Sequence, residues 1–377
     1  METVRGKCIF IFVESDLRWK FFTRFHKTLD VFGYEVVYVT NCLTVWIRGK
    51  LEGYNVILSK FKLFDKKIYK ANIQTKSIKK EILDVEIGDV NADEAAIILT
   101  KWNDFFCSTA NKYKPRVCFI YNGTSIFTYA AKKWAQNYKI KSLFFELANI
   151  DGKMFVDPWG TNAKSKAYAD DVLLDTYKMG KEDFDTWLNN YRNHKKNVKQ
   201  ALVSRKISNI FFYAINKIWF LGYLKRKRAY VNKELKRFIY RYKKDLFKKD
   251  NKVIKLDSLK PYYLFPMQVS IDSQILLNSD VSLERAIIYA REKAKKNNVN
   301  LLIKLHPAER DNRIKAQLEK IQSDSIFVVD KECSIDDFID NAEKIITINS
   351  TVGLEAILHD KDRSEERRVG KECRSRW

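Results

Sequence analysis

The sequence is poor in residues that interrupt compact structure, since its 377 residues include only 12 glycines and 5 prolines. Disordered or low-complexity linkers are usually rich in these residues, so the sequence predicts few such linkers. The length exceeds what one hydrophobic core usually serves, and the apolar fraction of 46% can supply more than one core. We therefore expect a compact chain of two domains.

The six cysteines contain no Cys-X-X-Cys pair and no zinc-like spacing. Cys8 and Cys118 lie in apolar segments that we predict to be buried strands, where cysteine behaves as a small apolar side chain. Reduced thiols in a cytoplasmic protein are therefore expected. The apolar run Cys8–Val13 ends after six residues at Glu14, which is too short for the apolar region of a signal peptide, so no export signal is predicted.

Acidic residues are scarce in the middle of the chain. The formal net charge is +23, and the segment Tyr191–Asp250 holds 19 Lys and Arg against three acidic residues. Its aromatic centre, Ile207–Leu224, is interrupted by Asn216 and Lys217 and is marginal as a membrane span. We expect an interfacial or inter-domain helix that suits an anionic membrane surface, with a solvated charge run as the alternative. Nucleic-acid binding is not predicted, because no binding motif accompanies the charge.

The N-terminal half alternates apolar strands with helices, a pattern typical of parallel α/β sheets. A turn-rich loop, Asn149–Asn162, ends this half. The predicted strands are Cys8–Val13, Glu35–Val39, Arg116–Tyr121 and Ser142–Leu147, and the predicted helices are Asp16–Phe32, Ala92–Lys112 and Ser125–Asn137.

The C-terminal half repeats this alternation with greater regularity. Two such halves facing each other form an architecture that many glycosyltransferases share. The predicted strands are Tyr262–Pro266, Asn300–Leu305, Ser325–Val329 and Lys344–Ile348, and the predicted helices are Ser282–Asn297, Asp311–Gln322, Ile335–Asn341 and Thr351–Leu358.

Polar groups follow the strands of the C-terminal half, where ligands of parallel sheets usually bind. The predicted strand Asn300–Leu305 carries Lys304 near its end and is followed by His306, which gives an ammonium and an imidazole. Another is followed by Ser350 and Thr351, which begin a helix whose N-terminus favours an anion, and Glu355 lies one turn further. These groups predict a phosphate site in which Glu355 could reach a ribose. Helix capping and an ordinary loop role are the alternatives.

Carboxylates and amides also follow strands of the N-terminal half. Glu146 ends one predicted strand, Asn122 follows another, and Asp157 and Asn162 lie in the loop beyond. A carboxylate at a strand end is a candidate base or nucleophile, with a capping or turn role as the alternative for Asp157. The first strand of the C-terminal half is followed by a further polar group, in a cleft or in an ordinary polar loop: Gln268, Asp272 and Gln274.

Five segments of the sequence, in this order, resemble bacterial capsular polysaccharide synthesis and export proteins. The studied members of that family look like transferases of 3-deoxy-manno-octulosonic acid (Kdo). The resemblance covers most of the chain from Val4 to Leu358. The segments are YNG at Tyr121–Gly123, FFELANIDGKMFVDPWGTN at Phe144–Asn162, FPMQVSIDSQ at Phe265–Gln274, KLHPAE at Lys304–Glu309 and NSTVGLEAIL at Asn349–Leu358.

The resemblance implies a glycosyltransferase of capsule polysaccharide synthesis and transport. It would transfer Kdo from CMP-Kdo to a lipid or Kdo-linker acceptor at the inner face of the cytoplasmic membrane, without a metal or another cofactor. Its implied partners are the nucleotide sugar, a lipid-linked acceptor, the membrane surface and other capsule assembly proteins. A CDP-polyol phosphotransferase of cell-surface polymer synthesis and a non-catalytic capsule export component are the alternatives.

The resemblance also implies roles for the strand-end residues. Lys304, His306 and the Ser350-Thr351 helix end would stabilise the departing CMP, while Asp157 or Glu146 would serve the acceptor side as nucleophile or base. The implied fold is GT-B-like, with two Rossmann-like halves facing a cleft and a basic helical insertion between them. The expected domains are an acceptor-side domain at residues 1–177, a basic helical segment at 178–260, a donor-binding domain at 261–360 and a tail at 361–377.

The family pattern breaks after Leu358, where a turn, another strand and closing helices are expected. Residues Arg363–Trp377 instead hold six basic and three acidic residues with no amphipathic period. The tail resembles artefactual read-through appended to truncated bacterial genes. We therefore predict that it does not continue the fold, and that the chain as written is truncated and of doubtful activity.

Overall fold

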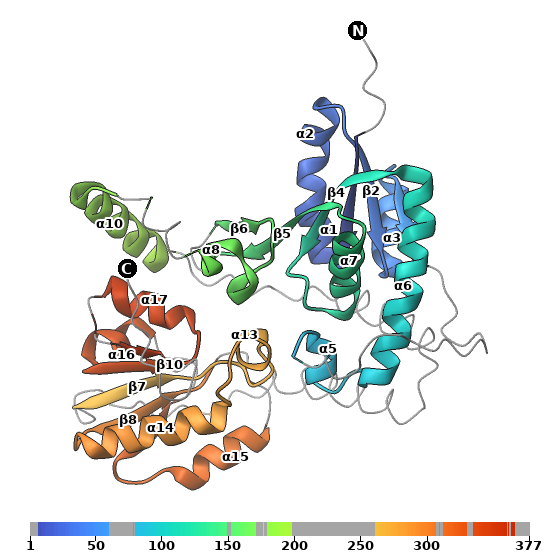
Figure 1. Ribbon diagram of the computed structural model, residues 1–377. Coiled ribbons are helices and arrows are strands. Elements are labelled where there is room, and N and C mark those ends of the chain that lie inside the picture. Colours follow the sequence, from blue (N-terminus) through green and yellow to red (C-terminus); the bar gives the residue numbers. More distant parts are fainter. Residues whose placement is uncertain are drawn as a thin grey trace. The chain divides into compact units, whose positions relative to one another are not determined.

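The chain divides into two compact units, Met1–Phe247 and Lys248–Trp377 (Figure 1). The finer domain limits at residues 177, 260 and 360 stay predictions, and the predicted helix at Ile207–Leu224 lies outside the described residues. The computed structural model describes residues 7–59, 78, 80–148, 152–170, 176, 179–197, 261–306, 309, 312–329, 335–359, 361 and 363–365.

The described part of the first unit is built on a six-stranded sheet of order β3-β2-β1-β4-β5-β6. Strands β1 to β5 pair in parallel, and β6 pairs antiparallel with β5. The order 3-2-1-4-5 is that of a Rossmann half, whose strand order reverses between β1 and β4. The strands are β1 Cys8–Val13, β2 Glu35–Thr40, β3 Val56–Leu58, β4 Pro115–Tyr121, β5 Lys141–Leu147 and β6 Met154–Asp157.

The predicted helix Asp16–Phe32 is divided by a 3-10 turn at Thr23–Phe25. The prediction of a loop over Asn149–Asn162 is wrong for Met154–Asp157, which form strand β6. Strand β6 has four residues and is held at the sheet edge by backbone pairing with β5, so it leaves little apolar pattern. The helices of this unit are α1 Asp16–Phe22, α2 His26–Val31, α3 Leu43–Leu51, α5 Leu83–Glu86, α6 Ala92–Tyr113, α7 Ile126–Asn137, α8 Lys166–Ala169 and α10 Lys181–Asn197.

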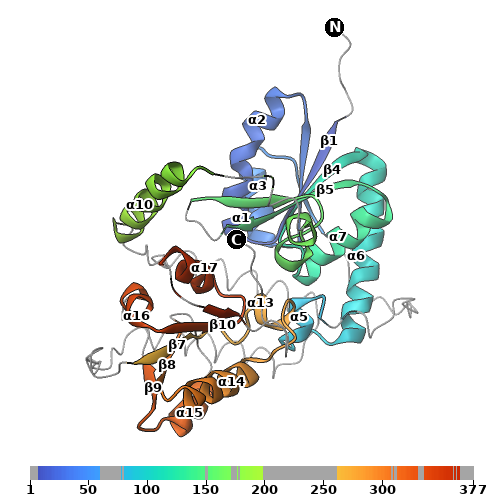
Figure 2. The same ribbon diagram turned by 60° about the vertical axis from the view of Figure 1, so that its left-hand side comes forward.

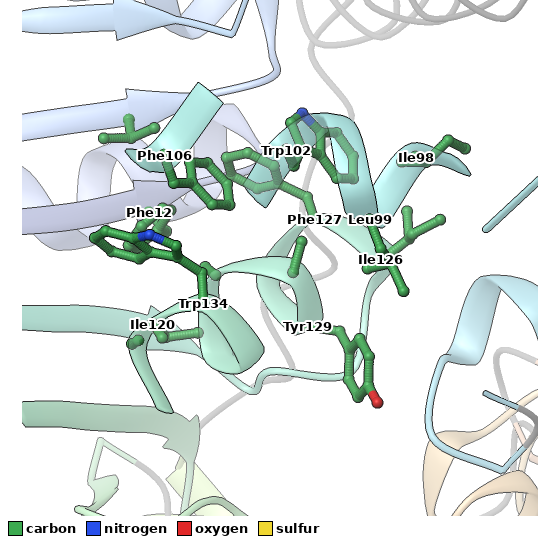
Figure 3. Packing of buried hydrophobic residues seen from close by; sticks show 14 of the residues in the cluster. Phe12, Ile98, Leu99, Trp102, Phe106, Ile120, Ile126, Phe127, Tyr129 and Trp134 are labelled. Atoms are coloured by element: carbon green, nitrogen blue, oxygen red, sulfur yellow. The ribbon is translucent and has the colours of Figure 1, made fainter. Parts of the chain in front are cut away.

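Large aromatic side chains fill the space between the first sheet and helices α6 and α7 (Figure 3). The ring of Phe12 on β1 lies 5.1 Å from that of Phe106 on α6, and Trp102 lies 5.1 Å from Phe127 on α7. Trp134 is also fully buried in this cluster. Such pairs contribute about 0.5–1.5 kcal/mol each beyond the area they bury, so they hold α7 and its N-terminus firmly against the sheet.

The second unit repeats the same topology in its described residues. Its sheet is parallel throughout, in the order β11-β10-β7-β8-β9, so the strand order reverses between β7 and β10. Helices α14 and α15 cover one face and α16 and α17 the other (Figure 2). The elements are β7 Tyr262–Pro266, α13 Ser273–Leu276, α14 Leu283–Lys296, β8 Asn300–Lys304, α15 Asn312–Ile321, β9 Ile326–Val329, α16 Ile335–Asn341, β10 Lys344–Thr347, α17 Thr351–Leu358 and β11 Arg363–Glu365.

The predicted strands and helices of the second half are confirmed, each with ends within one residue of the prediction. The prediction that the tail does not continue the fold is wrong for Arg363–Glu365, because Ile345 pairs with Arg363 and Thr347 with Glu365. A parallel edge strand is held by backbone hydrogen bonds and needs no apolar period. Residues 366–377 lie outside the described part of the chain.

The prediction of two Rossmann-like α/β halves is therefore confirmed by the strand order of each sheet. That the halves face a common cleft stays a prediction. Of the helices in the described ranges, none combines the length and the apolar character needed to cross a bilayer.

Candidate functional site

The strand-order reversal of the second sheet brings two polar residues together. Gln268 follows β7 and is buried, and its Nε2 donates a hydrogen bond to the backbone carbonyl oxygen of Asn349, 3.3 Å away, which follows β10. Ligands of doubly wound sheets bind at this kind of position. Gln268, which we predicted as a cleft residue, thus lies beside the predicted phosphate site.

Ser350 caps helix α17. Its Oγ accepts a hydrogen bond from the amide of Val352 at 3.3 Å, so the capping role that we gave as the alternative is present. Thr351 is exposed as the first residue of the helix, and Glu355, one turn further, is half-buried. The partial positive charge of this helix end favours an anion beside Ser350 and Thr351. The predicted contact of Glu355 with a ribose stays a prediction.

Asn349 fixes the loop around α13 to this edge. Its backbone takes a positive φ of 50°, and its Nδ2 donates to the carbonyl oxygens of Gln274 at 3.1 Å and Asn278 at 3.3 Å. Asp272 caps α13 by accepting from the amide of Gln274 at 2.8 Å, and the Gln274 Oε1 accepts from Asn278 at 3.2 Å. The side chains of Asp272 and Gln274 therefore shape this loop.

Lys304 and His306 lie at the end of the neighbouring strand β8. Lys304 is buried and His306 half-buried. Burial lowers the pKa of His306 below its ordinary value, and Lys304 adds to this effect, while the carboxylates of Asp272 and Glu309 oppose it. Glu309 is itself buried and accepts from the amide of Ser270 at 2.7 Å. The imidazole of His306, whose pKa is lowered, and the buried side chain of Lys304 therefore belong to the same strand end.

The corresponding edge of the first sheet carries a hydrogen-bonded polar cluster. Glu146 on β5 accepts from the hydroxyl of Tyr121 at 3.0 Å and from the Nδ2 of Asn122. Burial raises the pKa of Glu146, and these hydrogen bonds and the charge of Arg18 oppose that shift. The Arg18 guanidinium lies 3.2 Å from the centre of the Tyr121 ring. The structure thus brings the predicted residues Glu146 and Asn122 into direct contact.

Glu14 belongs to the same edge and was missed as a site residue. It directly follows β1, at the strand-order reversal, and its carboxyl accepts a hydrogen bond from Ser125, the N-cap of α7. Burial raises its pKa to about 7; the Ser125 hydrogen bond opposes this shift, and the nearby Asp84 and Glu146 add to it. The signal was available, because a carboxylate directly after a central strand satisfies the rule that selected Glu146.

Asp157 holds the loop that follows β6. One carboxylate oxygen accepts from the amides of Trp159 at 2.7 Å and Gly160 at 3.2 Å, and the other accepts from Lys166 at 2.9 Å and Ala167 at 3.4 Å. This is the turn role that we gave as the alternative for Asp157. Its predicted catalytic role stays a prediction.

The same loop is tied to the end of β4. Thr161 donates its hydroxyl to the backbone oxygen of Asn122 at 3.2 Å. Asn162 has a positive φ of 55°, and its backbone oxygen accepts from the Ser165 hydroxyl at 2.8 Å. The predicted residues Asn122, Asp157 and Asn162 therefore belong to one turn network, in which Asn162 takes part through its backbone oxygen.

The comparisons with known proteins point to one family. A family model described as capsule polysaccharide biosynthesis protein matches residues 182–363. The capsule polysaccharide export protein KpsS of Escherichia coli is 26% identical over 253 residues, which are 61% of this chain and 61% of KpsS. This chain is similar to the capsule polysaccharide synthesis and export proteins. The predicted resemblance is confirmed, and the chain matches about three fifths of the length of KpsS.

Several solved structures are similar at low identity. The Thermosulfurimonas dismutans KpsC β-Kdo 2,4 transferase has a TM-score of 0.41 and 15% identity, covering 67% of this chain and 68% of that one. The β-Kdo 2,7 transferase of the same KpsC has a TM-score of 0.41 and 12% identity, covering 95% and 78%. UDP-GlcNAc 2-epimerase from Methanocaldococcus jannaschii has a TM-score of 0.27 and 13% identity, covering 95% and 83%. The Rossmann-like assignment itself rests on the strand order of the two sheets.

Proposed function

We propose that this relative of the capsule synthesis proteins is a glycosyltransferase that transfers Kdo from CMP-Kdo to a lipid or Kdo-linker acceptor. The observation that carries the proposal is the set of Lys304, His306 and the Ser350-capped helix end at one edge of the second sheet, at the ends of the two strands, β8 and β10, that flank β7. The family match extends over strands β7 to β10 of this unit and ends at Arg363, the first residue of β11.

The donor side would be served by the second unit. CMP-Kdo carries a phosphate and a sugar carboxylate, so it presents two anionic groups. The ammonium of Lys304 and the positive end of α17 would stabilise the negative charge that develops on the departing CMP phosphate, and His306 would donate a hydrogen bond to it. Transfer without a divalent ion is part of the proposal, because these groups can supply the same electrostatic stabilisation.

The acceptor side would be served by the first unit. Glu146 would accept the proton of the acceptor hydroxyl while the new glycosidic bond forms and the bond to the CMP phosphate breaks. Glu14, with a pKa raised to about 7 by burial, is suited to hold a proton near neutral pH. Asp157 would keep the adjoining loop in place, since its carboxylate accepts four backbone amides.

The proposed site of action is the inner face of the cytoplasmic membrane, beside other capsule assembly proteins. The support is the basic composition of Tyr191–Asp250, which would attract anionic lipids. Binding of the chain to vesicles with and without anionic lipid, at low and high salt, tests this part separately.

The deciding assay follows release of CMP from CMP-Kdo and appearance of Kdo on a lipid acceptor, with and without EDTA. We expect transfer that persists in EDTA, is lost in Glu146→Gln with CMP binding unchanged, and is lost in His306→Ala with CMP binding weakened. Binding of CMP without turnover would favour the non-catalytic export component. Turnover of CDP-glycerol in place of CMP-Kdo would favour the phosphotransferase.

A further inference from the structure

Lys132 is a buried lysine on helix α7 of the first unit. It is only 8% exposed, and its Nζ lies 5.7 Å from the centre of the Phe144 ring on β5. Within the described ranges, no hydrogen bond or ion pair joins this ammonium to another group. Buried lysines are almost always paired with a carboxylate, so a buried lysine without one indicates a position suited to an anion.

The charges around Lys132 leave an excess of positive charge. Burial is the main cause that lowers the pKa of Lys132 to about 8; Lys164 and Lys133 add to this shift, and Glu81 opposes it. The carboxylate of Glu81 is already engaged, because it lies 3.3 Å from the Nζ of Lys164. Three ammonium groups therefore face one carboxylate in this part of the first unit.

The ammonium of Lys132 can be reached from solvent. Its Nζ is not among the enclosed and unpartnered polar atoms of the described residues, whereas the indole nitrogen of Trp134 on the same helix is. The side chain of Lys164 is 28% exposed. Lys164 is close enough for its charge to lower the pKa of Lys132, so one small anionic group is attracted by both.

The Lys132 side chain lies near the candidate base. Gly123, which follows β4, has a positive φ of 83°, and a Cβ atom there would lie 3.2 Å from Phe144 and 3.6 Å from Lys132. The preceding residue, Asn122, donates its Nδ2 to Glu146. The turn Asn122–Gly123 thus adjoins both Lys132 and Glu146.

We propose that Lys132, assisted by Lys164, binds an anionic group of the acceptor, either the carboxylate of a sugar acid or the phosphate of a lipid head group, and so directs an acceptor hydroxyl toward Glu146. The inference rests on the proposed function in that it assigns the anion to the acceptor. A charge-assisted hydrogen bond at this poorly solvated position is stronger than one in water, and it offsets the cost of burying the ammonium.

The test measures binding of two anionic probes to the full chain by isothermal titration calorimetry, with CMP present to occupy the donor edge. The probes are the methyl glycoside of Kdo and glycerol 3-phosphate, and their neutral counterparts are the carboxamide of that glycoside and glycerol. We expect an anionic probe to bind at least about 10-fold more tightly than its neutral counterpart, and Lys132→Met to remove this advantage. Binding of the glycoside alone identifies a sugar-acid acceptor, and binding of the phosphate alone identifies a lipid head group.

Lys133→Met is the matched control, because Lys133 is the next residue of the same helix and is exposed. It should leave the affinity for the anionic probe unchanged. Lys132→Met should melt no lower than the wild type, since it removes a buried charge and keeps most of the apolar stem. If this variant does not fold, Lys164→Met replaces it and should weaken the anionic probe by about 2- to 5-fold.

Three results would overturn the anion site. They are absence of binding by both anionic probes, equal affinity for the anionic and neutral probes, and an anionic preference that is unchanged in folded Lys132→Met or, in its place, in Lys164→Met. In the transfer assay, Lys132→Met should raise the KM for the acceptor by at least about 10-fold and leave the KM for CMP-Kdo unchanged. A chain that binds the anionic probe through Lys132 but transfers no Kdo would overturn the proposed function and leave the anion site standing.

Discussion

The carboxyl group of Glu14 lies at a buried position where its charged form is poorly solvated. Its pKa is raised from 4.5 to about 7, chiefly by burial, so the folded chain keeps its proton where the unfolded chain has lost it. Between about pH 4.5 and pH 7 Glu14 binds more protons in the folded state than in the unfolded state, so its contribution to the free energy of unfolding falls as pH rises. Above pH 7 Glu14 is charged in the folded state as well, and the full cost of burying this charge lowers the free energy of unfolding.

Replacing Glu14 by glutamine should therefore remove this pH dependence. At pH 8 Glu14→Gln is expected to be more stable than the wild type by about 2–3 kcal/mol, while at pH 4.5 the two should differ little. Urea unfolding at both values measures the difference, with exposed Glu292→Gln as the control that should shift neither. Equal stability of Glu14→Gln and wild type at pH 8 would contradict the raised pKa.

A substitution at Asp157 can distinguish its structural role in the loop from the catalytic role predicted from the sequence. In Asp157→Asn one carboxylate oxygen becomes an NH2 group that faces amide donors, so we expect a loss of about 1–3 kcal/mol in the free energy of unfolding. Denaturant unfolding monitored by circular dichroism measures it. If stability is unchanged while transfer is abolished, the catalytic role predicted from the sequence is the correct one.

At the scale of elements, helix α3 owes its packing to a glycine in its last turn. A Cβ atom at Gly49 would lie 2.8 Å from Trp19 on α1 and would also overlap Val56 on β3. Gly49→Ala should therefore lower the free energy of unfolding by about 1–3 kcal/mol although alanine favours helices. Gly180, where an added Cβ would lie 3.5 Å from Asp183 and meets no other described residue, is the control, and Gly180→Ala should change stability by less than about 0.5 kcal/mol. A stabilised Gly49→Ala would show that α3 can move away from Trp19.

Such contacts explain which elements could be predicted. The regular apolar strands β7, β8 and β10 and the long helix α6 follow from periodicity alone. Helix α3 contains a glycine that only its tertiary contacts explain, and strands β3 and β6 have three and four residues, too few for a clear period. Strand β11 depends on backbone pairing, to which its polar sequence gives no clue.

The candidate site residues also include some that the sequence could predict and some that it could not. The strand-end rule selected Glu146, Asn122, Lys304, His306 and Ser350, because the carboxyl ends of parallel strands always gather at one edge. The rule does not reveal hydrogen-bond partners. It therefore missed the loop-fixing role of Asn349 and left the role of Asp157 open, since both depend on backbone groups that only the fold brings into reach.

At the scale of the whole molecule, each unit has its own sheet and its own apolar clusters. We expect two calorimetric transitions, of which Gly49→Ala lowers one. CMP at 100 times its dissociation constant should raise only the other, by about 2.7 kcal/mol of unfolding free energy. A single transition that responds to both changes would mean that the units unfold together.

The repeated strand order also bears on how the protein can diverge. Each unit carries its own polar edge at its own strand-order reversal, so substitutions at Lys304 or Ser350 change one set of contacts and substitutions at Glu14 or Glu146 another. Under the proposed function, selection could then alter the activated sugar without disturbing the acceptor, or the acceptor without disturbing the sugar. A lineage of such chains is expected to acquire new polymer linkages by changes confined to one half at a time.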